Sequence, residues 1–185
     1  VVAQDGSAPG VDWEEVYTDG SGVTETEAMV QTADGGYVIA GHYTPDSSYG
    51  VDKDLRQQEG RVLKIASDGS VVWDKKYGDA GFDTINAVAR TSDGGYILAG
   101  SSWGKQDEEA WVVKIRSDGT VQWQNKYGDS ADSLALSVVE TTDGGYAFGG
   151  WKKYEGGNNI PNGWLVKVDS SGAKQWQETY GGDEG

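Results

Sequence analysis

The sequence predicts an all-β fold built from three copies of one unit, and three observations support that prediction. First, an eight-residue block that begins Asp-Gly-Gly-Tyr occurs at 34–41, 93–100 and 143–150. Second, each copy is followed by a turn of the Ser-Asp-Gly type that leads to a tryptophan, and each unit closes on Tyr-Gly. Third, the two blocks keep their order at a spacing of about 50 residues, which is typical of repeat architectures. No stretch of the sequence has the 3.6-residue period that would predict a helix.

The middle repeat predicts four strands joined by two tight turns and one longer loop. The expected strands are 85–91, 96–100, 111–115 and 121–127. Ser92-Asp93-Gly94-Gly95 forms the first turn, in which Gly94 supplies the positive φ that other residues resist. The other turn is Ser117-Asp118-Gly119. The glycines expected to have the same structural role in the three first turns are Gly35, Gly94 and Gly144.

Four short antiparallel strands in about 50 residues predict the blade of a β-propeller. The inner strands carry apolar residues on both sides, as sheets packed face to face require. We therefore expect one domain over 12–185, and residues 1–11 are expected to be a linker or a processed N-terminus. The expected blades are about 24–79, about 84–129 and about 134–183.

The N-terminus adds one strand to this plan. Residues 12–19 align with residues 72–79, the last strand of the first repeat, but no first three strands precede them. The fold class is therefore all-β, with three full four-stranded antiparallel blades and one extra N-terminal strand over 12–19. Both ends would leave unpaired sheet edges, which isolated soluble proteins usually avoid.

The turn followed by Val-x-Trp, as in Ser117-Asp118-Gly119-Thr120-Val121-Gln122-Trp123, resembles the tryptophan-docking motif of quinoprotein-type propellers. The whole repeat is also similar to repeats of secreted or surface proteins of bacteria and salt-loving archaea. The third repeat departs from it, with Ser171 at the turn position of the aspartate. The resemblance implies an extracellular or cell-surface location and tryptophans that pack between neighbouring blades. These tryptophans are Trp13, Trp73, Trp123 and Trp176. The resemblance implies no cofactor here, because no stretch supplies a convergent cofactor pocket.

The amino-acid composition limits the classes of molecule that this protein is expected to bind. Against 15 Lys and Arg the chain has 30 Asp and Glu, for a formal net charge of −15, and it has no cysteine. Such a charge repels nucleic acid and anionic membranes. No stretch approaches the roughly 18 apolar residues of a membrane helix, so no membrane insertion is expected. The expected partners are further blades of the same protein or copies of itself. The acidic surface indicates solubility or adaptation to high salt, and cation binding is the alternative.

Ligand-binding candidates lie where the second strand of each repeat ends. In an antiparallel meander, alternate connections fall at opposite ends of the sheet, so these residues share one end. Their aromatic rings can stack against glycans, although loop packing is the alternative. The candidates are His42, Tyr43, Trp103, Trp151 and Tyr154.

Two further sets of charged residues recur. Carboxylates in the connections between repeats offer oxygen ligands for Ca²⁺, but their spacing matches no calcium loop, and solvated acid is the alternative. These carboxylates are Asp79, Asp83, Asp129 and Asp132. Lys64, Lys114 and Lys167 occupy one repeated position, where each lysine is expected to meet a repeated carboxylate or carbonyl, or to reach solvent.

The sequence contains no catalytic signature. His42 is the only histidine, and no nucleophile-elbow motif is present. The prediction is a non-enzymatic extracellular or cell-surface propeller scaffold for binding or assembly. Two alternatives stay open. One is a carbohydrate-binding module that uses the aromatic loops, and the other is part of a larger propeller enzyme whose site lies in blades outside this chain.

Overall fold

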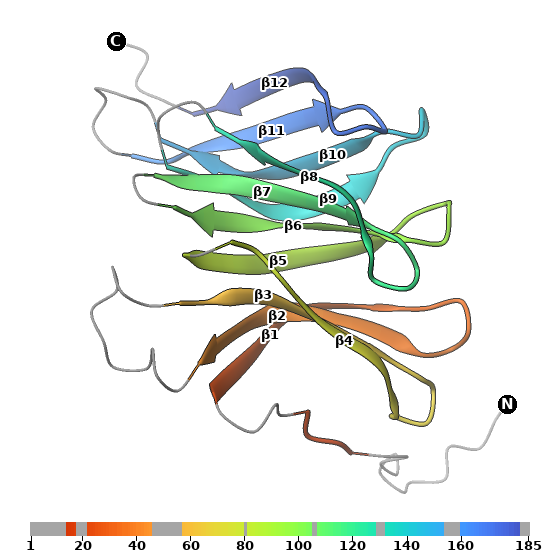
Figure 1. Ribbon diagram of the computed structural model, residues 1–185. Helices are drawn as coiled ribbons and strands as arrows, with labels where there is room; N and C mark the ends of the chain where they lie inside the picture. The colour runs from red at the N-terminus through yellow and green to blue at the C-terminus, as the bar shows by residue number, and fades with distance from the viewer. Residues whose placement is uncertain are drawn as a thin grey trace, which may run out of the picture.

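The computed structural model describes residues 14–17, 22–45, 57–79, 81–104, 107–128, 132–153 and 160–181. Over these residues the protein consists of twelve strands in three four-stranded antiparallel sheets, with no helix. The sheets stack one on another in chain order, from the orange and yellow first sheet through the green second sheet to the blue third (Figure 1). The prediction of an all-β chain built from four-stranded antiparallel units is confirmed.

Each sheet is a meander in which every strand pairs with its neighbours in sequence. The first sheet comprises β1 (Gly22–Gln31), β2 (Tyr37–Pro45), β3 (Glu59–Ile65) and β4 (Val71–Tyr77). The second comprises β5 (Phe82–Arg90), β6 (Tyr96–Trp103), β7 (Glu108–Ile115) and β8 (Val121–Tyr127). The third comprises β9 (Ser133–Glu140), β10 (Tyr146–Lys152), β11 (Asn162–Val168) and β12 (Lys174–Tyr180). In the second sheet, β6 and β7 are longer than the strands predicted at 96–100 and 111–115, because their backbone pairing continues beyond the apolar residues.

The glycines of the repeated block are required for different structural reasons, as the middle copy shows. Gly94 has φ +81° in the turn between β5 and β6, a conformation that glycine adopts without steric cost. Gly95 has no space for a side chain, because a Cβ there would overlap the carbonyl oxygen of Ile115. A Cβ on Gly100 would in the same way overlap the carbonyl oxygen of Thr84. The positive φ recurs at Gly35 (+83°) and Gly144 (+78°), so the turn geometry is common to all three sheets.

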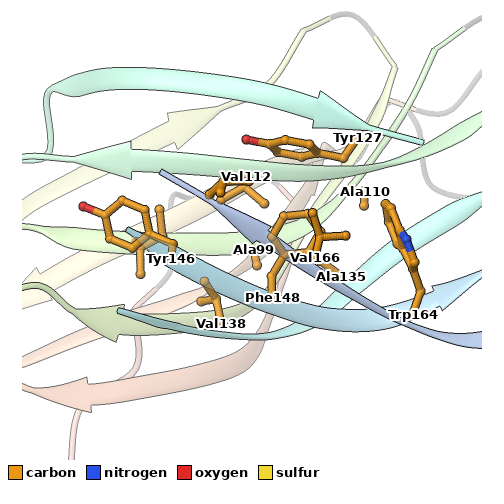
Figure 2. Packing of buried hydrophobic residues seen from close by; sticks show 12 residues of the cluster. Ala99, Ala110, Val112, Tyr127, Ala135, Val138, Tyr146, Phe148, Trp164 and Val166 are labelled. Atoms are coloured by element: carbon orange, nitrogen blue, oxygen red, sulfur yellow. The ribbon is translucent and has the colours of Figure 1, made fainter. Parts of the chain in front are cut away.

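The core lies between the sheets and not within any one of them. Alternate residues of β6 point to opposite sides: Tyr96 and Leu98 pack toward the first sheet, and Ile97 and Ala99 toward the third. Between the second and third sheets, Tyr127 lies over Phe148 with ring centroids 4.9 Å apart (Figure 2). Since each buried aliphatic or aromatic side chain contributes about 1.5–3 kcal/mol, these two interfaces hold the sheets together.

The extra N-terminal strand is not formed in the part of it that the structure describes. Residues 14–17 have no regular secondary structure, which corrects the prediction for this segment. A strand needs a neighbouring backbone to satisfy its N–H and C=O groups, and no backbone hydrogen bond among the described residues joins 14–17 to a sheet. The alignment of Tyr17 with Tyr77 nevertheless identifies a shared contact, because the Tyr17 hydroxyl donates to the carbonyl of Gly69 at 2.7 Å.

Candidate functional site: the docking contacts between sheets

A tyrosine hydroxyl makes the same contact three times along the chain. In each case it donates to the carbonyl of the glycine in the turn between the third and fourth strands of the following sheet. The pairs are Tyr17–Gly69, Tyr77–Gly119 and Tyr127–Gly172, at 2.7, 2.7 and 2.6 Å. Burial raises the pKa of Tyr77 and of Tyr127 above the ordinary value, so both hydroxyls stay protonated and act as donors.

A tryptophan four residues earlier makes the second docking contact. The indole N–H of Trp73 donates to the carbonyl of Ser117 at 3.1 Å, and that of Trp123 to the carbonyl of Ser170 at 3.0 Å. Trp13 lies outside the described residues. Because the acceptors are backbone carbonyls, the turn is recognised by its shape, and the third turn accepts its partner with Ser171 where the second has Asp118.

The third sheet carries the same pair of donors on a face that nothing covers in the described residues. Trp176 and Tyr180 in β12 are 45% and 60% exposed, whereas Tyr77 and Tyr127 are only 8% and 7% exposed. The described residues contain no fourth sheet whose turn would accept these two donors. The placement expected of Trp176 between two sheets is therefore absent in this part of the chain.

Other residues of the third sheet lie on the same face as Trp176 and Tyr180. In the second sheet, the residues that face the third are Ala89, Ile97, Ala99, Val112, Trp123 and Tyr127. The corresponding residues of the third sheet are Val139, Ala147, Gly149, Leu165, Trp176 and Tyr180, which we call the open face. Val139 is 56% exposed. Val139, Trp176 and Tyr180 are therefore exposed, although their counterparts in the second sheet are partly or fully buried. Ala147, Gly149 and Leu165 are partly buried.

The repeated lysines stabilise the turns at one end of the sheets. Lys114 is 2% exposed, and its ammonium lies 2.9 Å from a carboxylate oxygen of Asp93. The equivalent pairs, Lys64–Asp34 and Lys167–Asp143, are 2.9 and 3.0 Å long. Of the three environments left open for these lysines, a repeated carboxylate is the one that all of them have. All three aspartates have a lowered pKa, and hydrogen bonds from the partner lysine and a nearby threonine are among the causes.

A cavity of about 410 Å³ lies at this turn end, where the second and third sheets meet. Its lining includes Asp93, Lys114, Trp123, Glu140 and Tyr146. The rings of Trp123 and Tyr146 are tilted by 56°, with centroids 5.8 Å apart. The sequence predicted ligand-binding residues at the opposite end of the sheets. It gave no sign of this cavity, because a cavity shared by two sheets leaves no local pattern in either repeat.

The predicted ligand-binding residues come from three different sheets. His42 and Tyr43 lie in β2, Trp103 in β6 and Trp151 in β10, whereas Tyr154 lies outside the described residues. Tyr43 is only 5% exposed, and the ammonium of Lys76 lies 3.4 Å from its ring centroid. Little of this ring is therefore presented to a glycan. Trp103 and Trp151 are each partly buried.

The predicted calcium ligands have protein partners. Asp79 lies 3.6 Å from the ammonium of Lys126, and Asp132 lies 2.9 Å from that of Lys153. Asp83 is 1% exposed and accepts a hydrogen bond from the backbone N–H of Asp79 at 2.9 Å. Burial raises the pKa of Asp83. Asp129 lies outside the described residues.

Comparisons with known proteins do not supply a function. No family model matches the chain, and no curated protein is significantly similar to it. The described residues contain no helix that is long and apolar enough to cross a membrane.

Proposed function

We propose that this protein is a non-enzymatic extracellular or cell-surface scaffold of the β-propeller type, whose sheets act as blades that dock one on another. The observation that supports the proposal is the open face, where Trp176 and Tyr180 repeat the docking donors of the other two blades but stay 45% and 60% exposed. The function is then to receive a further blade there and so to build a larger assembly.

The two internal interfaces define what the open face accepts. A matching partner is a sheet whose turn between the third and fourth strands presents two carbonyls, spaced like those of Ser117 and Gly119. Propellers have about four to eight blades, so three sheets would form only part of a ring. The further blade comes either from additional repeats of the same protein or from a second copy of this chain. In the second copy, the turn of the first sheet would exchange its contact with Tyr17 at Gly69 for the incoming donors.

The location is part of the same proposal. A net charge of −15 suits a salt-rich exterior, where counterions screen the repulsion between carboxylates. The likeness of the repeat to surface-protein repeats supports the same location. The proposal assigns no catalytic role to this chain.

Sedimentation velocity over a range of concentrations tests whether copies supply the further blade. We expect association that Trp176→Asp weakens, because a carboxylate on the open face would be desolvated without a partner. Ile160→Asp is the matched control, since Ile160 is 61% exposed and lies outside the strands, just before β11.

A chain extended by a duplicate of its third repeat tests the other source. We expect the added repeat to increase the free energy of unfolding, and Trp176→Asp to remove that increase. A wild-type chain that stays monomeric, together with an added repeat that brings no stabilisation, would refute the proposed docking function.

A further inference from the structure

Three side chains with metal-ligating atoms gather on the first sheet, away from the docking contacts. They are Glu25 and Glu27 of β1 and His42 of β2, and one ligand atom from each lies within 4.8 Å of the other two. Among the described residues this is the only such group of three or more. The sequence alone assigned His42 to an aromatic surface and gave no role to either glutamate.

The pairing of β1 with β2 brings the three residues together. Glu25 and His42 are direct cross-strand partners in the antiparallel register. The register then shifts between Thr26 and Ala28, so Glu27 has no cross-strand partner. A bulge of this kind re-aims a side chain, and here it accompanies the approach of a second carboxylate to the histidine.

The other two sheets show that the fold does not require ionisable groups at these positions. In the second sheet the equivalents are Thr84, Asn86 and Ser101, and the Thr84 and Ser101 hydroxyls lie 3.2 Å apart. The amide of Asn86 donates to the carbonyl of Ala135 at 3.0 Å. In the third sheet the equivalents are Leu134, Leu136 and Trp151. Neither of these two sets contains an ionisable group, so the ionisable set in the first sheet is not a requirement of the repeat.

The imidazole of His42 has unused binding capacity. The side chain is 13% exposed, and its Nδ1 atom is buried with no hydrogen-bond partner in the part of the chain that the structure describes. The Nδ1 atom lies 4.0 Å from a carboxylate oxygen of Glu27, and the Nε2 atom lies 3.6 Å from one of Glu25. Both distances exceed those of ordinary hydrogen bonds. The two distances involve different ring nitrogens, and one ion would bind only one of these. With one ligand atom taken from each residue, the three atoms lie within 4.8 Å of one another. Two ligands held about 2.0 Å from one tetrahedral ion are roughly 3.3 Å apart, so the glutamate side chains would move inward when the ion binds.

We propose that Glu25, Glu27 and His42 bind a divalent first-row transition-metal ion, with Zn²⁺ as the reference ion. Imidazole nitrogen with carboxylate oxygens suits such ions, whereas Ca²⁺ and Mg²⁺ prefer oxygen ligands alone. The glutamate side chains are 61% and 42% exposed, so solvent can supply the remaining ligand and the ion can enter. This site is independent of the docking function and lies on a different sheet from the open face.

The test uses the only histidine of the chain as its reporter. Zn²⁺ is titrated into the tag-free protein at about 0.15 M salt, where surface charge is well screened, while the ring resonances of His42 are followed by NMR. We expect these resonances to shift and to saturate at one equivalent of Zn²⁺. Neither excess Ca²⁺ nor excess Mg²⁺ should reproduce the shift.

Variants establish which side chains hold the ion. Glu25→Gln and Glu27→Gln should each weaken Zn²⁺ binding by about tenfold or more, a loss at least as large as that for second-shell partners. Both glutamates are exposed, so folding should be retained, and circular dichroism checks this. Glu178→Gln, at an exposed carboxylate of β12, is the matched control and should leave the affinity unchanged.

Two results would overturn the metal site. One is a set of His42 resonances that do not move in excess Zn²⁺, and the other is an equal affinity in the wild type and both glutamine variants, which would place the bound ion on diffuse surface acid. If Ca²⁺ displaces Zn²⁺ at comparable concentration, the assignment to a transition metal is wrong.

Discussion

At the scale of single residues, Lys114 shows how the repeat accommodates a buried charge. Its ammonium lies 3.0 and 2.9 Å from the two carboxylate oxygens of Asp93 and 3.2 Å from the carbonyl of Ile115. These acceptors satisfy an ammonium group that water cannot reach, because Lys114 is only 2% exposed. Losing the carboxylate would leave a buried cation without its counter-charge, which is one of the costlier changes in a protein.

Asp93→Asn tests this pair through its pH dependence. Burial acts to raise the pKa of Asp93, but hydrogen bonds from Thr91 and Lys114 outweigh it and lower the pKa to about 2. This folded-state pKa is below the unfolded value of about 3.9, so Asp93 stabilises the fold fully above that value. The contribution is lost as the pH falls from about 4 to about 2.

We expect Asp93→Asn to lower the free energy of unfolding at pH 7 by about 1–3 kcal/mol, a range reduced because the aspartate itself is half exposed. Urea denaturation at a series of pH values measures this. The difference between variant and wild type should shrink between pH 4 and pH 2. A difference that stays constant over this range would mean that the pair does not set the titration of Asp93.

At the scale of elements, one strand type occurs in two environments. The outer strands β8 and β12 have the same Trp-x-x-x-Tyr pattern. The side of β8 that carries Trp123 and Tyr127 faces the third sheet, whereas the matching side of β12 faces no sheet in the part of the chain that the structure describes. The Tyr127 hydroxyl is therefore buried on the carbonyl of Gly172, whereas Tyr180 is 60% exposed. The same residue type should contribute very differently to stability in these two strands.

Tyrosine-to-phenylalanine variants measure this difference, because they remove the hydroxyl and keep the ring. Tyr77→Phe should lower the free energy of unfolding by about 1 kcal/mol, because the buried carbonyl of Gly119 loses its donor. Tyr127→Phe should lower it by a smaller amount, because the carbonyl of Gly172 keeps the hydrogen bond from the Asn125 amide. Tyr180→Phe should change it by less than about 0.5 kcal/mol in dilute solution. An equal loss in Tyr180→Phe at low concentration would show that Tyr180 is already docked in the monomer.

At the scale of the whole molecule, charge acts against the packed sheets. The chain has 30 acidic residues and 15 basic ones. Several of the basic residues are already committed to local pairs such as Lys114–Asp93 and Lys153–Asp132. The remaining carboxylates repel one another, and salt screens that repulsion because the Debye length falls from about 10 Å at 0.1 M to about 3 Å at 1 M.

We therefore expect the thermal stability to rise with ionic strength. Melting followed by circular dichroism between low and molar NaCl checks this, and the same series in KCl separates screening from a specific sodium effect. A melting temperature that stays flat or falls would mean that the acids are neutralised by pairing or by bound metal.

Much of the architecture could be predicted from the sequence because it depends on short-range chemistry. The turn at Gly94 needs a positive φ, and the alternation along residues 96–99 places apolar side chains on both sides of one strand. Repetition of these signals made the three four-stranded sheets predictable. The pairing of Lys114 with a repeated carboxylate was also among the possibilities that the sequence offered, because a lysine and an aspartate recur at equivalent positions in every copy.

The sequence by itself determined the three four-stranded units and their turns. The docking tryptophans were implied by a resemblance, whereas the docking contacts of Tyr77 and Tyr127 were found only in the structure. Only the tertiary structure decided which docking residues are covered. Trp123 and Trp176 have the same local pattern, but within the described ranges a neighbouring sheet covers Trp123 and none covers Trp176. The tertiary structure also decided that Glu25, Glu27 and His42 meet, since cross-strand register and a bulge join residues distant in sequence. Local patterns specify how a strand is built, whereas burial and proximity depend on what packs against it.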